Sequence, residues 1–304
     1  MEYGKLGNTD IEVSKLCVGC MSFGKAGTMH DWTLDEAESE NVIKHALDLG
    51  YNLIASKVYF NEGRLSRQAI MREIDGTLSR LGTDYLDLYI IHRFDYDTPI
   101  EETMEALHDL VKAGKVRALG ASAMYGYQFY NMQLAARDNG WTPFSAMENH
   151  YNLLYREDER ELLPICKQMK VSLMPYSPLA AGHLSRPQWK SESLRGTTDR
   201  VAMGKYDKTE AEDMQIVKRV AELAEKYNCK MSQIAIAWQW AKGILSPIIG
   251  ATKTQYLDDS AGAFDIKLTA EDLAYLEEPY VPHEIVGAID KNPAQGVILL
   301  DEKK

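Results

Sequence analysis

Along the chain, short apolar runs alternate with segments in which apolar residues recur every three or four positions. One such segment follows Ser66, carries Ile70, Ile74 and Leu78 on one face, and stops at Gly82. This spacing predicts an amphipathic helix that begins after a Ser66 cap and ends at Gly82. Capping-box sequences predict three further helix starts, at Thr33, Thr98 and Thr209.

The apolar runs between the helical segments are predicted strands. Most are apolar throughout instead of alternating, which is typical of parallel strands covered by helices. We expect seven of them, over residues 15–20, 51–56, 85–91, 116–121, 144–148, 171–174 and 246–249. This alternation predicts an α/β fold, either a closed (β/α) barrel or an open doubly wound sheet. The absence of G-x-G-x-x-G disfavours the open sheet, and the absence of a linker predicts one domain over residues 1–304.

Charge and composition narrow the classes of partner. Asp and Glu (45) outnumber Lys and Arg (34), and the net charge of −11 argues against nucleic acid or an anionic membrane as partner. No apolar run reaches the roughly 18 residues of a membrane span, and the first residues lack the apolar run of a signal peptide. Four cysteines do not make a disulfide framework, so we expect a cytoplasmic location. We interpret Cys17 and Cys20, a C-x-x-C pair, as ordinary strand residues.

Polar residues follow several of the predicted strands. In a (β/α) barrel such positions surround the mouth of the active site. They are Lys57, His92, Ser122, Glu148, Asn149, Tyr176 and Ser177. A lysine and a histidine at neighbouring strand ends can hydrogen-bond a reacting carbonyl oxygen and tune a proton donor. The alternative is structural: Lys57 extends along the rim into solvent, and His92 is a half-buried ring with satisfied hydrogen bonds.

Other catalytic patterns are missing from the sequence. There is no H-E-x-x-H and no close cluster of His, Asp and Glu, so we expect no catalytic metal. Residues 120–124 lack the second glycine of a nucleophile elbow, which disfavours a hydrolase.

A series of motifs then runs in order through nearly the whole chain. They lie within residues 3–14, 19–24, 81–92, 151–153, 176–182 and 247–253. On these motifs the chain resembles the aldo-keto reductases, especially the bacterial branch similar to potassium-channel β-subunits. The resemblance implies a (β/α)₈ barrel of the TIM-barrel type with an N-terminal β-hairpin. It also implies an oxidoreductase that binds NADP(H) without a Rossmann domain and reduces small-molecule aldehydes or ketones by hydride transfer.

The resemblance also assigns roles to individual residues. Lys57 and His92 resemble two members of the family's catalytic tetrad, and Tyr176 resembles the ring that stacks on the nicotinamide. Ser122 and Asn149 match carboxamide-side contacts, and Glu148 stands where the family has a carboxamide-binding Gln. The remaining expected cofactor contacts are Gly19 and Met21 near the start, Ser177, Leu179 and Gly182 at the pyrophosphate, Gly250, Thr252 and Lys253 at the 2′-phosphate, and Asp259 at the adenine. Lys253 near a helix start fits a phosphate, although it could also be a solvated surface lysine.

The sequence departs from the family pattern in three places. Glu148 keeps an acceptor but loses the NH₂ donor of Gln, and Ser260 stands where many members have Asn. The largest departure is that Tyr51 and Asn52 run straight into residues 53–57, without the intervening helix or the tetrad Asp and Tyr. About 30 residues, one βα unit, are missing by this comparison, which agrees with the count of seven strands.

This predicted deletion has two consequences. Either the 51–57 strand bridges a wider gap, or the sheet stays open at an edge where another copy of the chain could pair as a homo-oligomer. The proton donor is also lost, and loss of general acid catalysis typically costs ~10²–10⁴-fold. Tyr59, two residues after Lys57, points to the same side if the strand continues, and is a candidate substitute.

Three functions stay open on this basis. The first is an NADP(H)-dependent oxidoreductase of aldo-keto reductase type with impaired catalysis. The second is a catalytically silent NADP(H)-binding sensor or regulatory subunit, and the third is a rearranged gene product without a role. Loops over residues 21–32 and 182–208 are expected to select the substrate, and preference for NADP over NAD depends mainly on Lys253.

Overall fold

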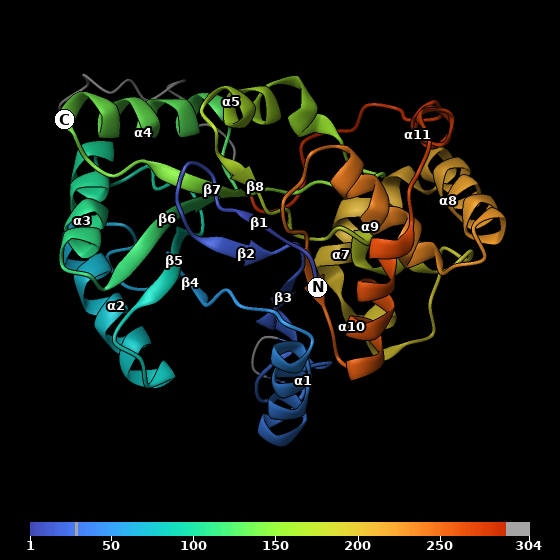
Figure 1. Ribbon diagram of the computed structural model, residues 1–304, viewed down its shortest axis with the longest axis horizontal. Helices are drawn as coiled ribbons and strands as arrows, with labels where there is room; N and C mark the ends of the chain where they lie inside the picture. Colours follow the sequence, from blue (N-terminus) through green and yellow to red (C-terminus); the bar gives the residue numbers. More distant parts are fainter. Residues whose placement is uncertain (28–29, 290–304) are drawn as a thin grey trace.

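The N-terminal residues form the predicted β-hairpin in the computed structural model, which describes residues 1–27 and 30–289. Strand β1 (Tyr3–Lys5) pairs antiparallel with β2 (Glu12–Ser14). Apolar side chains of the hairpin, including Leu6 and Val13, pack against Leu88 and Ile90 of the central sheet. The hairpin therefore closes one end of the space that the parallel strands enclose, and it lies at the centre of the view in Figure 1.

Seven parallel strands follow, as the sequence predicts. Five form one sheet in the order β4 (Ala55–Val58), β5 (Leu86–Ile91), β6 (Val116–Ser122), β7 (Phe144–Glu148) and β8 (Ser172–Leu173). The other two, β3 (Cys17–Gly19) and β9 (Ile248–Gly250), pair with each other. A bridge between Tyr176 and Ile248 joins β9 to the chain that continues β8. The spatial order is therefore β3, β9, β8, β7, β6, β5, β4.

The sheet is open between β3 and β4, because no strand pairing joins them in the described part of the chain. The predicted strand over residues 51–56 is wrong over residues 51–54, since β4 begins only at Ala55. The side chain of Asn52 accepts from the Ser14 N–H at 2.8 Å and donates to the Glu12 carbonyl at 2.9 Å. These bonds tie residue 52 to the hairpin instead of to a neighbouring parallel strand.

The helices cover the outer face of the strands (Figure 1). Their bounds are α1 Glu36–Asp48, α2 Arg67–Leu81, α3 Ile100–Lys112, α4 Gly126–Asn139, α5 Leu162–Gln168, α6 Leu194–Thr198, α7 Arg200–Tyr206, α8 Glu210–Lys226, α9 Met231–Ala241, α10 Thr254–Ala261 and α11 Ala270–Glu277. Short 3₁₀ turns lie at Cys20–Ser22, Glu157–Arg160, Ala180–Ser185, Asp207–Thr209 and Gly262–Asp265. The expected irregular loop over residues 182–208 thus contains two short helices, α6 and α7.

Local capping chemistry decides where these helices begin. The prediction for α2 is confirmed: the Ser66 side chain accepts from the Ala69 N–H, and Gly82 ends the helix in the left-handed conformation (φ 64°). The cap predicted at Thr33 is wrong, because Asp35 and Glu38 form the same reciprocal box two residues later. Thr209 is the N-cap of α8 as expected, but the N-cap of α3 is Pro99 and not Thr98. The hydroxyls of Thr98 and Thr209 donate to Asp95 and Asp213 instead of accepting from the helix.

The strands divide the core into two faces, because successive residues of a strand point to opposite sides. Tyr89 and Ile91 of β5 belong to the large outer cluster between the sheet and the helices. Leu88 and Ile90 belong to the inner cluster with the hairpin. This alternation determines which rim residues face the interior of the incomplete barrel.

Candidate functional site

The predicted catalytic pair lies at the carboxyl ends of two neighbouring strands. Lys57 is in β4, in register with Ile90 of the inner cluster, so its side chain lies on the interior side. His92 directly follows β5, and its N–H donates to the Val58 carbonyl at 2.9 Å. Most of the other predicted site residues also lie at or just after strand ends on this rim: Gly19, Met21, Ser122, Glu148, Asn149, Tyr176, Ser177, Gly250 and Thr252.

Lys57 forms an ion pair with Glu148. The Lys57 Nζ lies 2.6 Å from the Glu148 Oε2, with 32% of the lysine side chain and 4% of the glutamate side chain exposed. Burial opposes the ammonium charge, but the neighbouring carboxylate outweighs it and the pKa of Lys57 is raised. Burial, with Lys57 and Arg93 nearby, lowers the pKa of His92 to about 4. At neutral pH the rim therefore presents a charged lysine beside a neutral imidazole.

The condition under which Tyr59 would share the side of Lys57, a strand that continues to residue 59, is not met. Strand β4 ends at Val58, and Tyr59 packs with Val58 in the outer cluster, where 9% of it is exposed. The Tyr59 N–H donates to the Asn61 side chain at 3.1 Å, which turns the chain away from the strand direction. The tyrosine therefore lies on the other face of the sheet from Lys57.

Asn149 carries an unsatisfied acceptor next to this pair. Its amide nitrogen donates to the Asp158 carboxyl at 2.8 Å, but its Oδ1 is buried without a hydrogen-bond partner in residues 1–27 and 30–289. Such an acceptor suits an NH₂ donor of a bound ligand. The Ser122 hydroxyl donates to the Glu148 carbonyl at 2.8 Å and fixes that strand end. Burial raises the pKa of Asp158 to about 7.

The Tyr176 ring contacts two residues that the sequence did not single out. His150 stacks parallel to it at 5.4 Å between ring centroids, and the Lys205 Nζ lies over it at 4.9 Å. The imidazole of His150 is itself fixed by a 2.7 Å hydrogen bond to the Tyr206 hydroxyl. Burial lowers the pKa of Lys205 to about 8. Lys205 lies in α7, about thirty residues from Tyr176 in sequence, so only the fold reveals this contact.

The expected pyrophosphate loop has a strained backbone. Ser177 (φ 57°), Ala180 (φ 47°) and Ala181 (φ 54°) all adopt positive φ, followed by Gly182 (φ 100°). Left-handed conformations of non-glycine residues cost free energy and occur preferentially at functional sites. The side chain of Asn152 donates to the Ser177 carbonyl at 2.9 Å and supports this loop. Leu179 lies in the same turn and is half-buried.

The expected 2′-phosphate site combines a helix start with two cations. Lys253 immediately precedes α10, and Gly250 ends β9. A Cβ placed on Gly250 would meet only the Arg195 Nη1, at 3.8 Å. The guanidinium of Arg195 stacks over the Trp32 ring at 4.3 Å, which brings the two expected specificity loops into contact. Arg195 was not predicted, because nothing in its sequence neighbourhood marks it as a ligand.

Asp259, the expected adenine contact, already has a charged partner. Its carboxylate lies 2.6 Å from the Lys230 Nζ and accepts from the Gln255 side chain at 2.9 Å. Both Cys17 and Cys20 are free thiols, and burial raises the pKa of Cys17 to about 12. Such a thiol is a weak nucleophile at neutral pH.

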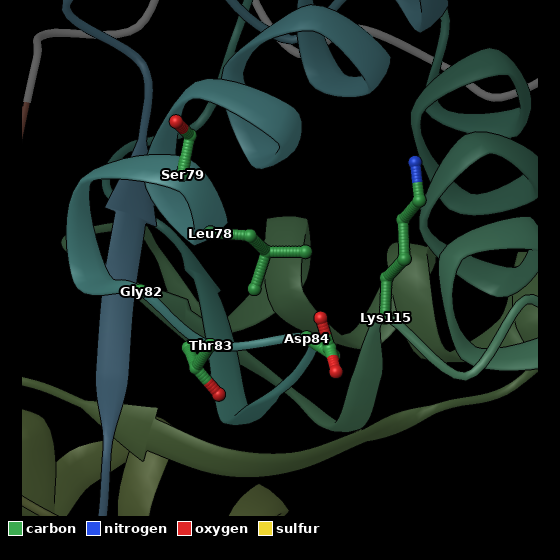
Figure 2. A pocket seen from close by; sticks show the side chains of 6 residues that line it. All are labelled: Leu78, Ser79, Gly82, Thr83, Asp84 and Lys115. Atoms are coloured by element: carbon green, nitrogen blue, oxygen red, sulfur yellow. The ribbon is translucent and has the colours of Figure 1, made fainter.

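A separate hollow lies at the opposite end of the strands. Figure 2 shows that it is lined by Leu78, Ser79, Gly82, Thr83, Asp84 and Lys115. Lys115 precedes β6 and pairs with Asp75 at 2.5 Å. None of the predicted site residues lies there. Within residues 1–27 and 30–289, no His, Cys, Asp or Glu residues group as a metal site, and no helix could cross a membrane.

The hydrogen-bonding and charged groups along the rim fit a nicotinamide dinucleotide phosphate. The buried Asn149 Oδ1 provides an acceptor for a carboxamide, and the small residue Gly250 leaves space beside Arg195. Lys253 and the start of α10 provide positive charge for a phosphate, and Arg195, whose guanidinium also pairs with Asp199 at 3.1 Å, lies beside Gly250. Asn149 follows β7 and Gly250 ends β9, so these features lie on the same rim with only β8 between their strands.

Comparison with known proteins gives a consistent result. The model of the aldo/keto reductase family matches residues 53–280. The chain is 37% identical to the versiconal hemiacetal acetate reductase of Aspergillus parasiticus, over 94% of this chain and 98% of that protein. It is 36% identical to an aldo-keto reductase of Alternaria alternata (91% of each chain), and 34% identical to one of Metarhizium robertsii (94% and 93%). The first alignment extends over 340 positions, more than the 304 residues of this chain, so it contains gaps here.

Proposed function

The chain belongs to the aldo/keto reductase family, a family of oxidoreductases, and from this premise we propose that it reduces aldehydes or ketones with NADPH. The observation that carries the proposal is the position of Lys57 and His92 at neighbouring strand ends, beside the unsatisfied Asn149 acceptor. Bound NADPH would supply the hydride. The residues of this chain would hold the carbonyl group and manage its charge.

The charge states at the rim suit this task. The Lys57 ammonium and the neutral His92 ring both donate hydrogen bonds to the carbonyl oxygen, which stabilises the negative charge that develops on it. Since Tyr59 lies on the outer face, we assign the proton to Lys57, which is one-third exposed and can regain a proton from water. Without a tyrosine acid we expect slow turnover, reduced by the ~10²–10⁴-fold typical of lost general acid catalysis.

We further propose NADP(H) over NAD(H) as cofactor, because Lys253, Arg195 and the start of α10 gather positive charge beside Gly250. Replacing Lys253 with Ala is expected to weaken NADPH binding about tenfold or more while leaving NADH binding nearly unchanged. Fluorescence titration with each cofactor measures this difference. Equal losses for both cofactors would contradict the 2′-phosphate assignment.

A missing βα unit between β3 and β4 is also part of the proposal. It is supported by the absence of pairing between these strands in the described residues and by the gapped alignment with the longer relative. The tetrad Asp and Tyr would have been lost with that unit.

The second candidate function is a silent NADP(H)-binding protein, which the absence of those two residues favours. NADPH fluorescence reports binding, and NADPH consumption with a reactive aldehyde reports turnover. Turnover that disappears in Lys57→Met would support the reductase. Binding without any consumption would identify the silent protein, and failure to bind NADPH would overturn both.

A further inference from the structure

We propose that Glu148 is the counter-ion that holds Lys57 protonated and fixed at the mouth of the barrel. Glu148 would thus be a positioning residue for carbonyl reduction, in place of a ligand of the nicotinamide carboxamide. This inference rests on the proposed reductase function.

The geometry places the two groups across the mouth from each other. Lys57 is in β4 and Glu148 ends β7, and two strands, β5 and β6, separate them in the sheet. Their 2.6 Å contact therefore spans the interior above the ends of β5 and β6. The Glu148 main chain is fixed by the Ser122 hydroxyl, and only 4% of its side chain is exposed. The carboxylate cannot turn to solvent without breaking the pair.

No other described group can replace this carboxylate. The neighbours that act on Lys57 besides Glu148 are the thiols of Cys17 and Cys20, and burial raises the pKa of both thiols, so they are neutral. His92 from the end of β5 is neutral above about pH 4, and Arg93 next to it is a cation. Removal of the Glu148 charge would leave a partly desolvated ammonium without a counter-ion, whose pKa then falls.

The protonated form of Lys57 is the one that the reaction needs. When hydride from bound NADPH adds to the carbonyl carbon, the C=O π electrons would move to oxygen, and Lys57 Nζ would give a proton to that oxygen. The products are an alcohol, NADP⁺ and a neutral amine, which takes a proton from water. Glu148 is unchanged throughout and favours the return of the amine to the ammonium form.

The test compares Glu148→Gln, which keeps the shape and removes the charge, with Glu277→Gln as a matched control. Glu277 is a part-buried glutamate of α11 that pairs with Arg156 and Lys242, and neither Lys57 nor Glu148 is among its ion-pair partners. The first readout needs no cofactor: NMR titration of ¹³C-methylated lysines, with the Lys57 signal assigned from Lys57→Arg. The second is the pH profile of kcat/KM for aldehyde reduction, and the third is the Kd for NADPH.

We expect Glu148→Gln to move the Lys57 titration to lower pH by about one unit or more, since an opposite charge at this distance shifts a pKa by that amount. The alkaline limb of kcat/KM should move with it, and Glu277→Gln should change neither. An unchanged Lys57 titration would overturn the proposal, as would tighter NADPH binding with an unmoved titration, which would identify Glu148 as a carboxamide contact. If neither the wild type nor any variant shows turnover at any pH, the proposed reductase function is wrong. The Lys57 titration still shows whether Glu148 holds Lys57 protonated.

Discussion

Three side chains at the rim have environments that move their pKa values in different directions. Burial, with the cations of Lys57 and Arg93 nearby, lowers the pKa of His92 to about 4, and burial, with neighbouring carboxylates, raises that of Asp158 to about 7. Lys57 is also desolvated, but a carboxylate at 2.6 Å reverses the effect. The distance to one opposite charge therefore decides which of these groups is ionised at neutral pH.

Asp158 should make the stability of the protein depend on pH. Because its folded pKa of about 7 exceeds the ordinary value of 3.8, the folded state holds this proton more tightly than the unfolded state. Its contribution to the free energy of unfolding should fall as pH rises from about 4 to 7, by up to about 4 kcal/mol. Urea unfolding of the wild type and of Asp158→Asn at pH 4.5 and 8 measures this, and the variant should gain relative stability at pH 8. Asp138→Asn, at an exposed carboxylate, is the control, and a pH-independent difference would contradict the assignment.

Tyr59 should have little part in proton transfer. Because it packs in the outer cluster, Tyr59→Phe should leave kcat/KM for aldehyde reduction within about twofold, whereas Lys57→Met should lower it about 10²-fold or more. Steady-state assays of both variants with the same aldehyde decide the point. A large loss of kcat/KM in Tyr59→Phe would show that the tyrosine does take part in the reaction.

The sequence allowed prediction of the residues that follow strands, but not of contacts between distant segments. Lys57 and His92 could be identified because an apolar run of strand length precedes each. Lys205 over Tyr176 and Arg195 beside Gly250 could not, because the intervening chain has no periodic relation to either contact. The ion pair of Glu148 with Lys57 could not be predicted for the same reason.

Among the elements, the segment over residues 281–289 is held against the site by hydrogen bonds of Val286 and, above all, of His283. His283 forms an ion pair with Asp213 of α8 at 3.0 Å, and its N–H donates to Glu157 at 2.8 Å. Further along, a Cβ placed on Gly287 would lie 3.6 Å from the Tyr176 hydroxyl. The segment thus passes over the predicted nicotinamide site.

Loss of the His283 charge should loosen this segment. Burial lowers the pKa of His283, but Asp213 outweighs burial and the net shift is upward. The pair therefore stabilises the fold fully below about pH 6.5 and loses its effect as pH rises through the folded pKa. His283→Gln should lower the free energy of unfolding by about 3 kcal/mol at pH 5.5, because it leaves Asp213 buried without a cation, and by less at pH 9. Urea unfolding at both pH values measures this, and an equal loss at both would contradict it.

The ends of helices were predictable where nearby side chains and glycines determine them. Helix α2 matches its expected cap and its glycine end, whereas α1 begins two residues late because Asp35 offers a second box. Residues 51–54 have the apolar pattern of a strand, but only the Ile54 carbonyl bonds to the backbone of β5 and no strand in the described residues pairs on their other side, so β4 begins only at Ala55. Strand formation depends on a partner strand, and the pattern of one segment cannot show whether the partner exists.

At the scale of the whole molecule, the number of strands was predictable, but whether the sheet closes into a barrel was not. Seven runs predict seven strands, and seven parallel strands are present in the described residues. Which edge stays open depends on tilt and register, which are properties of the assembled sheet. The hairpin and residue 52 occupy the region before β4, a packing that no local pattern indicates.

The open edge exposes the backbone of the very strand that carries the proposed catalytic lysine. The Ile54 carbonyl accepts from β5 and the Val58 carbonyl accepts from His92 just after it, so the alternating peptide groups of Ala55 and Lys57 are directed toward the gap. We expect deuterium uptake at the Lys57 amide to be at least about tenfold faster than at Ile90, its neighbour in register, as read by native-state exchange NMR. Equal protection would mean that the edge is sealed. If uptake is fast, local opening of the four-residue strand β4 determines how long Lys57 stays in its catalytic position. A ligand that contacts both Lys57 and the opposite side of the mouth would then slow this opening.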